Sequence, residues 1–118
     1  MADLSDNALN VMLTALRGVA VFASLHTADP TNVGDHEVAG GSPAYARKAV
    51  TWGAPSAGAM DTSATHQFDV PAGTTVTHWG LWSAASSGTF YGSGTLAVPE
   101  SFGGQGKITM LTGTTALG

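Results

Sequence analysis

The most strand-like stretch of the chain is residues 75–83, TVTHWGLWS, in which successive side chains suit opposite faces of a strand. A period of two places Val76 and Trp82 on one face and Trp79 and Leu81 on the other. We expect Trp79 and Leu81 to face the core, and Trp82 to face a second layer, a loop or a neighbouring subunit. The pattern therefore predicts a central strand about which the other strands are arranged.

A helical pattern precedes the strands, over residues 5–17. Leu9, Met12, Leu13 and Leu16 share one apolar face, Ser5 suits the N-cap, and Gly18 is expected to end the helix in the left-handed conformation. Because so short a helix is marginal alone in water, it must pack on something. One alternative is its own sheet. The other is a partner or symmetry mate, with the three leucines as interface residues.

Turn signals separate several further apolar runs. They predict strands at residues 19–26, 44–52, 65–70, 89–98 and 107–111, a short edge strand near 58–60, and glycine-rich turns such as 99–106. The polar loop at residues 27–43 is unusually long, which is typical of a functional or interaction segment. We therefore predict one domain over residues 1–118: an N-terminal helix (1–18) and a mainly β, antiparallel sandwich of six to seven strands (19–118).

Composition restricts the possible functions. Only 4 basic and 8 acidic residues occur, the net charge is −4, and there is no cysteine. The scattered basic residues argue against a nucleic-acid surface, and the lack of cysteine excludes disulfides and zinc–thiolate sites. No apolar run reaches the roughly 20 residues of a membrane span. The N-terminus lacks the basic start of a secretory signal, so we expect the mature chain to begin near Met1.

Candidate catalytic and metal-binding groups are few. Asp35, His36 and Glu37, with Asp29 nearby, either hold a divalent cation or form a solvated loop, and the second interpretation is favoured. A Ser/His/Asp set can be written from Ser24, His26 and Asp29, but nothing supplies an activated nucleophile or an oxyanion hole. We therefore predict no enzyme activity, no metal and no cofactor.

Two other groups of side chains have alternative interpretations. His26 is expected to be satisfied by loop backbone, and His66 and His78 lie on strands that could pair. Four aromatic side chains have two interpretations: Trp52, Trp82, Tyr91 and Phe102. They either line a carbohydrate platform or belong to the core and a subunit interface, and the second interpretation is favoured.

A resemblance to known proteins covers residues 7–96. It rests on three segments: LNVMLTALRG, VFASLHTADPTNVGDHEVAGGSPAYARKAVTWG and VTHWGLWSAASSGTFYGSGTL. The combination of SLHTADP and YARKAVTW resembles small virion proteins of tailed bacteriophages, many described as tail fibre or minor tail proteins, particularly of actinobacterial phages. The resemblance implies a β-sandwich virion component that assembles as an oligomer, and it implies no catalytic residues. Capsid decoration proteins, often trimers, have a similar size.

We predict a non-enzymatic structural protein of a phage particle, made in the host cytoplasm and assembled as a homo-oligomer such as a trimer on the virion surface. Its partners are itself and major capsid or tail proteins, and head or tail location is left open. The predicted interface residues are Leu9, Leu13, Leu16, Asp29 in the loop at 29–41, Trp82 and Tyr91. The alternative is a host receptor- or glycan-binding tail module that exposes Trp82 and Tyr91. An envelope-degrading enzyme is disfavoured by the absence of an acid/base set.

Overall fold

The structure is a computed structural model that describes residues 5–59 and 66–110. These residues form one helix and six strands: α1 (Asp6–Arg17), β1 (Phe22–His26), β2 (Lys48–Ala49), β3 (His66–Val70), β4 (Thr74–Trp82), β5 (Phe90–Phe102) and β6 (Gly106–Met110). The predicted fold class is confirmed, because the chain is mainly β, antiparallel and sandwich-like, with one N-terminal helix.

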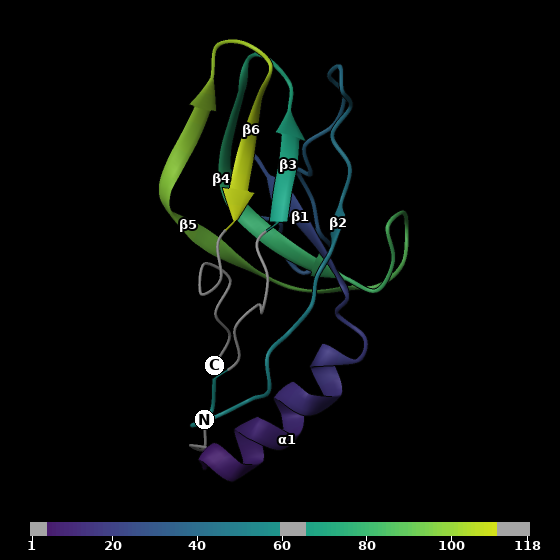
Figure 1. Cartoon of the computed structure of the whole chain (residues 1–118), viewed down its shortest axis with the longest axis vertical. Coiled ribbons are helices and arrows are strands. Elements are labelled where there is room, and N and C mark those ends of the chain that lie inside the picture. Colours follow the sequence, from purple (N-terminus) through teal and green to yellow (C-terminus); the bar gives the residue numbers. More distant parts are fainter. Residues whose placement is uncertain (1–4, 60–65, 111–118) are drawn as a thin grey trace.

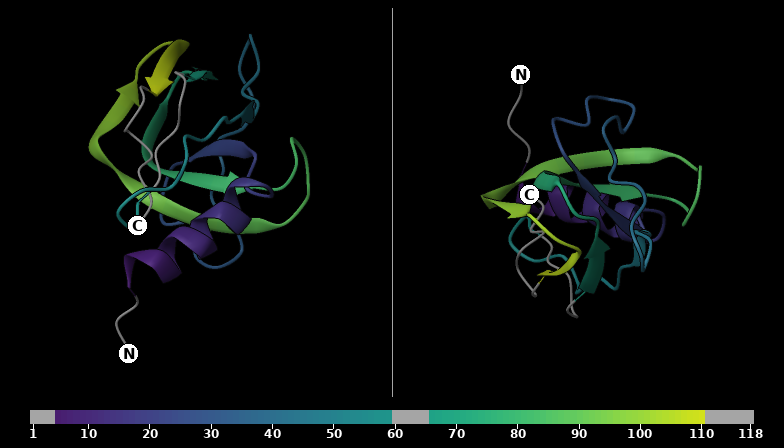
Figure 2. Two further views of the ribbon diagram at one scale, coloured as in Figure 1. Left: turned by 60° about the horizontal axis from the view of Figure 1, so that its bottom comes forward. Right: turned by 90° about the horizontal axis from the view of Figure 1, so that it is seen from above.

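Two antiparallel sheets face one another across the core (Figure 1). The larger has the strand order β2-β1-β4-β5, and the smaller pairs β3 with β6. The predicted central strand is β4, which pairs with β1 on one side and β5 on the other. In the right view of Figure 2, β3 and β6 lie on one side of the β4–β5 ribbon and part of the loop at 27–47 extends on the other.

The core lies between the sheets. Trp79 and Leu81 face it as predicted, together with Phe68 from the smaller sheet. Val76 belongs to the same core, although strict alternation places it on the opposite face. The ladder between β4 and β5 shifts register between Val76 and His78, and this irregularity resets the alternation of side chains along β4.

The strand expected at residues 44–52 is much shorter than predicted, since only Lys48 and Ala49 pair with β1. The physical reason is that the long loop already occupies the rest of that edge. The Val38 N–H donates to the Leu25 carbonyl, and the Leu25 N–H donates to the Tyr45 hydroxyl. Side-chain and loop hydrogen bonds therefore replace a ladder here.

Strand β5 is longer than predicted and continues through Pro99 to Phe102. The expected loop at 99–106 was therefore wrong, and the turn comprises residues 103–105 alone. Proline is tolerated because the ladder between β4 and β5 is irregular there. His78 pairs with Thr95, but the next pair of the ladder joins Val76 to Glu100, so Pro99 lies between the paired residues. This irregularity lets β5 bend between the two layers.

Helix α1 lies at one end of the molecule (Figures 1 and 2). Ser5 caps it as predicted, since its Oγ accepts from the Ala8 N–H. The left-handed conformation expected for Gly18 was wrong: its φ is −81°, and its N–H bonds back to helix carbonyls in a tightened last turn. The short edge strand expected near 58–60 is reduced to one bridge, Ser56 to Ala59, and Met60 lies outside the described residues. No helix in the described residues has the length and apolar character needed to cross a membrane.

Candidate functional site

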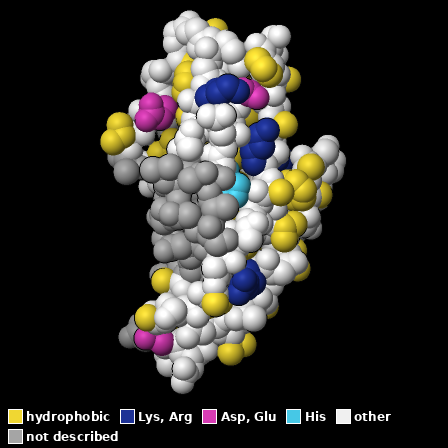
Figure 3. All heavy atoms as spheres, in the orientation of Figure 1, with side chains coloured by type: hydrophobic (Ala, Val, Ile, Leu, Met, Phe, Trp, Pro, Cys, Tyr) yellow, Lys and Arg dark blue, Asp and Glu magenta, His cyan; other side chains and the backbone are white. Residues whose placement is uncertain are grey.

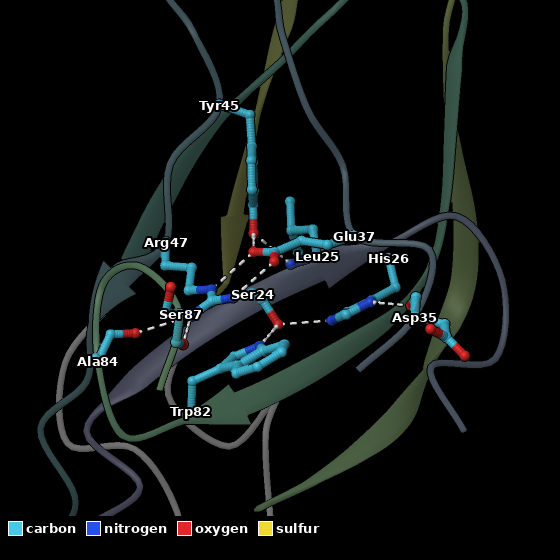
Figure 4. Close-up of polar contacts among 10 residues, drawn as sticks. All are labelled: Ser24, Leu25, His26, Asp35, Glu37, Tyr45, Arg47, Trp82, Ala84 and Ser87. Carbon is cyan, nitrogen blue, oxygen red and sulfur yellow. Dashed lines mark hydrogen bonds and ion pairs between the residues drawn. The ribbon is translucent and has the colours of Figure 1, made fainter. Parts of the chain in front are cut away.

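The long loop, residues 27–47, is held to the larger sheet by a polar clamp centred on Arg47 (Figure 4). Arg47 Nε and Nη2 donate to the two carboxylate oxygens of Glu37, each at 2.9 Å. Its Nη1 donates to the carbonyls of Ala84 and Ser87 in the β4–β5 loop, at 3.0 and 2.8 Å. One guanidinium therefore fixes two loops that are far apart in the sequence. We call the set of four side chains Arg47, Glu37, Tyr45 and Trp82 the arginine clamp.

Tyr45 provides a further hydrogen bond to the partly buried carboxylate of Glu37. Its hydroxyl donates to Glu37 at 2.9 Å and accepts from the Leu25 N–H at 3.0 Å, so it links the loop to the backbone of β1. Burial raises the pKa of Tyr45 well above its ordinary value, and the adjacent Glu37 carboxylate acts in the same direction. The phenol is therefore neutral at every physiological pH and serves as a fixed donor.

Trp82 lies beneath the guanidinium, with Arg47 Cζ 3.6 Å from the centre of its ring. Phe90 meets the same indole edge-on, and a Cβ added at Gly34 would fall within 2.5 Å of two ring atoms. The side chain is 8% exposed. The long loop, one of the three surroundings expected for Trp82, covers the ring and leaves little of it accessible to a host envelope. The role of Trp82 as an interface residue stays a prediction.

A second buried group lies beside the clamp. Trp82 Nε1, which is only a donor, bonds Ser24 Oγ at 2.9 Å, and Ser24 Oγ lies 2.7 Å from His26 Nε2. The His26 Nδ1–H donates to the Asp35 carbonyl at 2.7 Å, so in the neutral ring Nε2 is an acceptor and the serine hydrogen points to it. Burial lowers the pKa of His26, so a neutral ring is favoured. The prediction that loop backbone satisfies His26 is confirmed.

The Ser24–His26 pair has the spacing of a nucleophile and its base, but its surroundings do not suit catalysis. Both side chains are 0% exposed, which leaves no route for a substrate. The serine oxygen also accepts from Trp82, which opposes nucleophilic attack. Asp29 takes no part in the pair, because the group that orients His26 is the backbone carbonyl of Asp35. We interpret the pair as a structural element.

The acidic loop does not form a cation site. Glu37 is committed to the clamp, and Asp35 accepts from the Thr31 hydroxyl at 3.0 Å. Among residues 5–59 and 66–110, no cluster of histidine and carboxylate side chains has the arrangement needed to hold a metal ion. The disfavoured alternative of a facing pair of His66 and His78 does not occur, because His78 lies opposite His26 and His66 lies opposite Met110.

The predicted interface residues differ in accessibility. Asp29 is exposed and caps a turn of the loop, where its carboxylate accepts from the Thr31 N–H. Tyr91 is 42% exposed on β5. Trp52 is buried and donates to the Ala20 carbonyl, and Phe102 packs against the core. Core packing rather than a carbohydrate platform therefore accounts for the tryptophans.

The leucines of α1 face their own chain. Leu13 is 8% exposed and belongs to the core, Leu16 packs against that core, and Leu9 lies beside Gly58. The role of the three leucines in contacts between chains stays a prediction, and the burial of Leu13 leaves it little surface for another molecule. The expected place of Met12 on the leucine face was wrong: Met12 is 56% exposed and lies with Val11, which is 72% exposed, on the outer surface of the helix. In Figure 3, hydrophobic side chains are visible at the end of the molecule that carries α1.

The arginine clamp was not predicted from the sequence, although a signal was present. Tyr45 and Arg47 share one face of an alternating segment, and Arg47 is one of only 4 basic residues in the chain. The planar guanidinium of arginine suits bidentate pairing with a carboxylate, so Arg47 indicates such a partner. The identity of that partner, Glu37, follows only from the fold.

Comparison with known proteins connects this architecture to a bacteriophage. Residues 3–118 match the sequence model of a family described as podophage GP4 fiber I protein gp80. None of the curated proteins compared with the chain matches it. The match supports the resemblance to phage virion proteins, and the family name indicates a structural role. The chain belongs to the podophage GP4 fiber I protein gp80 family, a family of bacteriophage fibre proteins.

Proposed function

We propose that the protein is a homo-oligomeric, non-enzymatic subunit of a tail fibre that docks on the rest of the particle through the outer surface of α1. The fibre name of the family favours the tail over a decoration site on the capsid. The actinobacterial host implied by the sequence resemblance remains a further proposal.

The observation that supports docking is the exposure of two large apolar side chains on α1. Of the charged residues of the helix, Arg17 donates to the Trp52 carbonyl, and Asp6 lies exposed in the first turn beside Gly58. Val11 and Met12 face outward. The outer side of α1 also carries the exposed polar residues Asn7 and Thr14. Large apolar side chains that are exposed next to one another are typical of a contact surface, so we expect a fibre or tail protein to cover Val11 and Met12.

Incorporation into particles tests the docking surface. We expect Val11→Asp and Met12→Asp to fold normally, because both side chains are exposed, and to be lost from purified phage by about tenfold or more. Ser86→Asp, which adds the same charge to an exposed loop, is the matched control and should be incorporated normally. Circular dichroism would confirm folding. Normal incorporation of folded Val11→Asp and Met12→Asp proteins would contradict the proposal.

A host-contact role for the clamped loops is the second candidate function. The observation that favours it is that Arg47 joins the long loop to the β4–β5 loop, so both are presented as one ordered surface. The isolated protein would then bind host cell-wall material saturably, and Arg47→Met would weaken that binding. Absence of saturable binding would exclude this candidate.

A further inference from the structure

Strand β5 forms one edge of the larger sheet. It pairs with β4 on one side, and in the described part of the chain no strand pairs with it on the other. Alternate residues of an antiparallel edge strand direct N–H and C=O groups outward, which makes the edge a template for another strand. Figure 1 shows β5 along the outer side of the molecule.

The two edges of this sheet differ in how they are protected. The opposite edge is β2, which has two residues and carries Lys48, so it is short and charged. Strand β5 has 13 residues and contains no charged residue or proline between Phe90 and Val98. Proteins commonly prevent unwanted pairing with short strands, lysine or proline at an edge. The first half of β5 has none of these features.

Side chains on β5 also permit close approach. Ser93 and Thr95 are small and exposed, and a Cβ added at Gly92 would meet nothing within 4 Å. Gly94 is required on the inner side, since a Cβ there would lie 2.4 Å from the Trp79 ring. The accessible segment is bounded by two register shifts in the β4–β5 ladder, at Tyr91 and after Thr95.

We propose that β5 pairs antiparallel with β5 of a second copy of this chain, about a two-fold axis at Ser93. This register sets Ser93 against Ser93, Gly92 against Gly94, and Tyr91 against Thr95 of the other copy. No like charges oppose one another, and the aromatic ring lies against a β-branched side chain, which favours sheet pairing. The two larger sheets then form one continuous sheet. This inference rests on the proposed homo-oligomer and names its contact.

The purified protein tests this pairing without the phage. We expect the full chain to be a dimer by native mass spectrometry and light scattering. Ser93→Lys should raise the dimer Kd by about tenfold or more, because two lysines would face each other across the axis. Ser86→Lys is the matched control and should remain dimeric. A wild-type monomer or trimer, or a Ser93→Lys dimer of unchanged affinity, would overturn the proposal.

An engineered cysteine tests the register. The chain has no cysteine, so Ser93→Cys introduces the only thiol. Residues directly opposite in antiparallel strands lie within disulfide range, so we expect rapid formation of a covalent dimer in mild oxidant. Ser86→Cys should cross-link much more slowly, and equal rates for the two variants would contradict the register. These assays do not measure docking through α1. A negative result would overturn the β5 pairing alone, whereas the incorporation of Val11→Asp and Met12→Asp proteins tests the docking proposal.

Discussion

The guanidinium of Arg47 stacks on the indole of Trp82, with 3.6 Å between Cζ and the ring centre. The Arg47 side chain is 8% exposed, and the Glu37 carboxylate accepts two hydrogen bonds from its guanidinium. The cost of desolvating this ion pair is offset by the two carbonyls of the β4–β5 loop and by the Tyr45 hydroxyl. The clamp thereby joins the long loop to the β4–β5 loop.

Removing one partner of the clamp should be costly. We expect Arg47→Met to lower the free energy of unfolding by about 3 kcal/mol, because Glu37 is left as an unpaired, partly buried charge. Urea denaturation followed by tryptophan fluorescence would measure the loss. Lys48→Met, which removes the neighbouring positive charge outside the clamp, should change stability by less than about 0.5 kcal/mol. Similar losses for the two variants would contradict the assigned role of Arg47.

A double-mutant cycle should show that Arg47 and Glu37 act as a pair. We expect Glu37→Gln combined with Arg47→Met to be less destabilising than the sum of the single changes, by at least about 1 kcal/mol, since the double variant leaves no unpaired charge. Additive effects would show that the ion pair contributes little.

Deleting the Tyr45 hydroxyl isolates its hydrogen bonds. Tyr45→Phe keeps the ring, which stacks on Phe68, but leaves the Leu25 N–H without its acceptor and Glu37 with one donor fewer. We expect a loss of about 1–3 kcal/mol in unfolding free energy. Tyr91→Phe removes a hydroxyl from the exposed tyrosine and should be nearly neutral, so a similar loss in both would contradict the account.

Two glycines of β5 should respond differently to the same substitution. Gly94→Ala places a Cβ against the Trp79 ring, at 2.4 Å, and we expect a loss of about 1–3 kcal/mol in unfolding free energy. Gly92→Ala meets open space and should change stability by less than about 1 kcal/mol. Thermal denaturation would compare the two, and equal losses would mean that Gly94 does not face Trp79.

Acid should destabilise the protein through His26. Because burial lowers the pKa of folded His26 below its ordinary value near 6.5, the unfolded state binds the proton more readily. Stability should therefore be fully present above about pH 6.5 and fall as the pH drops below it, with a slope of up to about 1.4 kcal/mol per pH unit for one proton.

Histidine variants separate this contribution from others. Burial also lowers the pKa of His66, which acts in the same direction. We expect His26→Gln to reduce the slope of unfolding free energy against pH between about pH 5.5 and 7 more than His66→Gln does, because the His26 side chain is completely buried and hydrogen-bonded. Equal slopes in wild type and His26→Gln would contradict the buried, neutral histidine.

Local pattern was sufficient to predict the elements with strong periodicity. Ser5 and the leucine spacing located α1, and the alternation around Trp79 located β4. The predictions failed where tertiary contacts override local preference. Residues 44–47 alternate like a strand, but Tyr45 and Arg47 use their side chains to bind β1 and Glu37 instead of extending a ladder. Pro99 resembles a strand end, but the bend of β5 accommodates it.

The candidate site was harder to predict because it depends on residues that are distant in the sequence. The loop at 27–43 was recognised by its length. Asp29 is exposed in this loop, and Tyr91 is exposed on β5. A loop was one of the three surroundings expected for Trp82. Its burial under Arg47 depends on a contact across 35 residues that periodicity does not encode. Met12 was grouped with the leucines because its spacing fits their face, and the exposure of Val11 was not predicted.

Immunogold labelling of intact particles with an antibody to this protein tests the central claim, that it is a fibre subunit of the virion, most directly. The account predicts a few grains per particle, confined to the tail. Dense labelling over the head would contradict the fibre assignment and indicate a capsid decoration protein. No labelling, with an antibody that binds the purified native protein, would contradict a place on the virion surface.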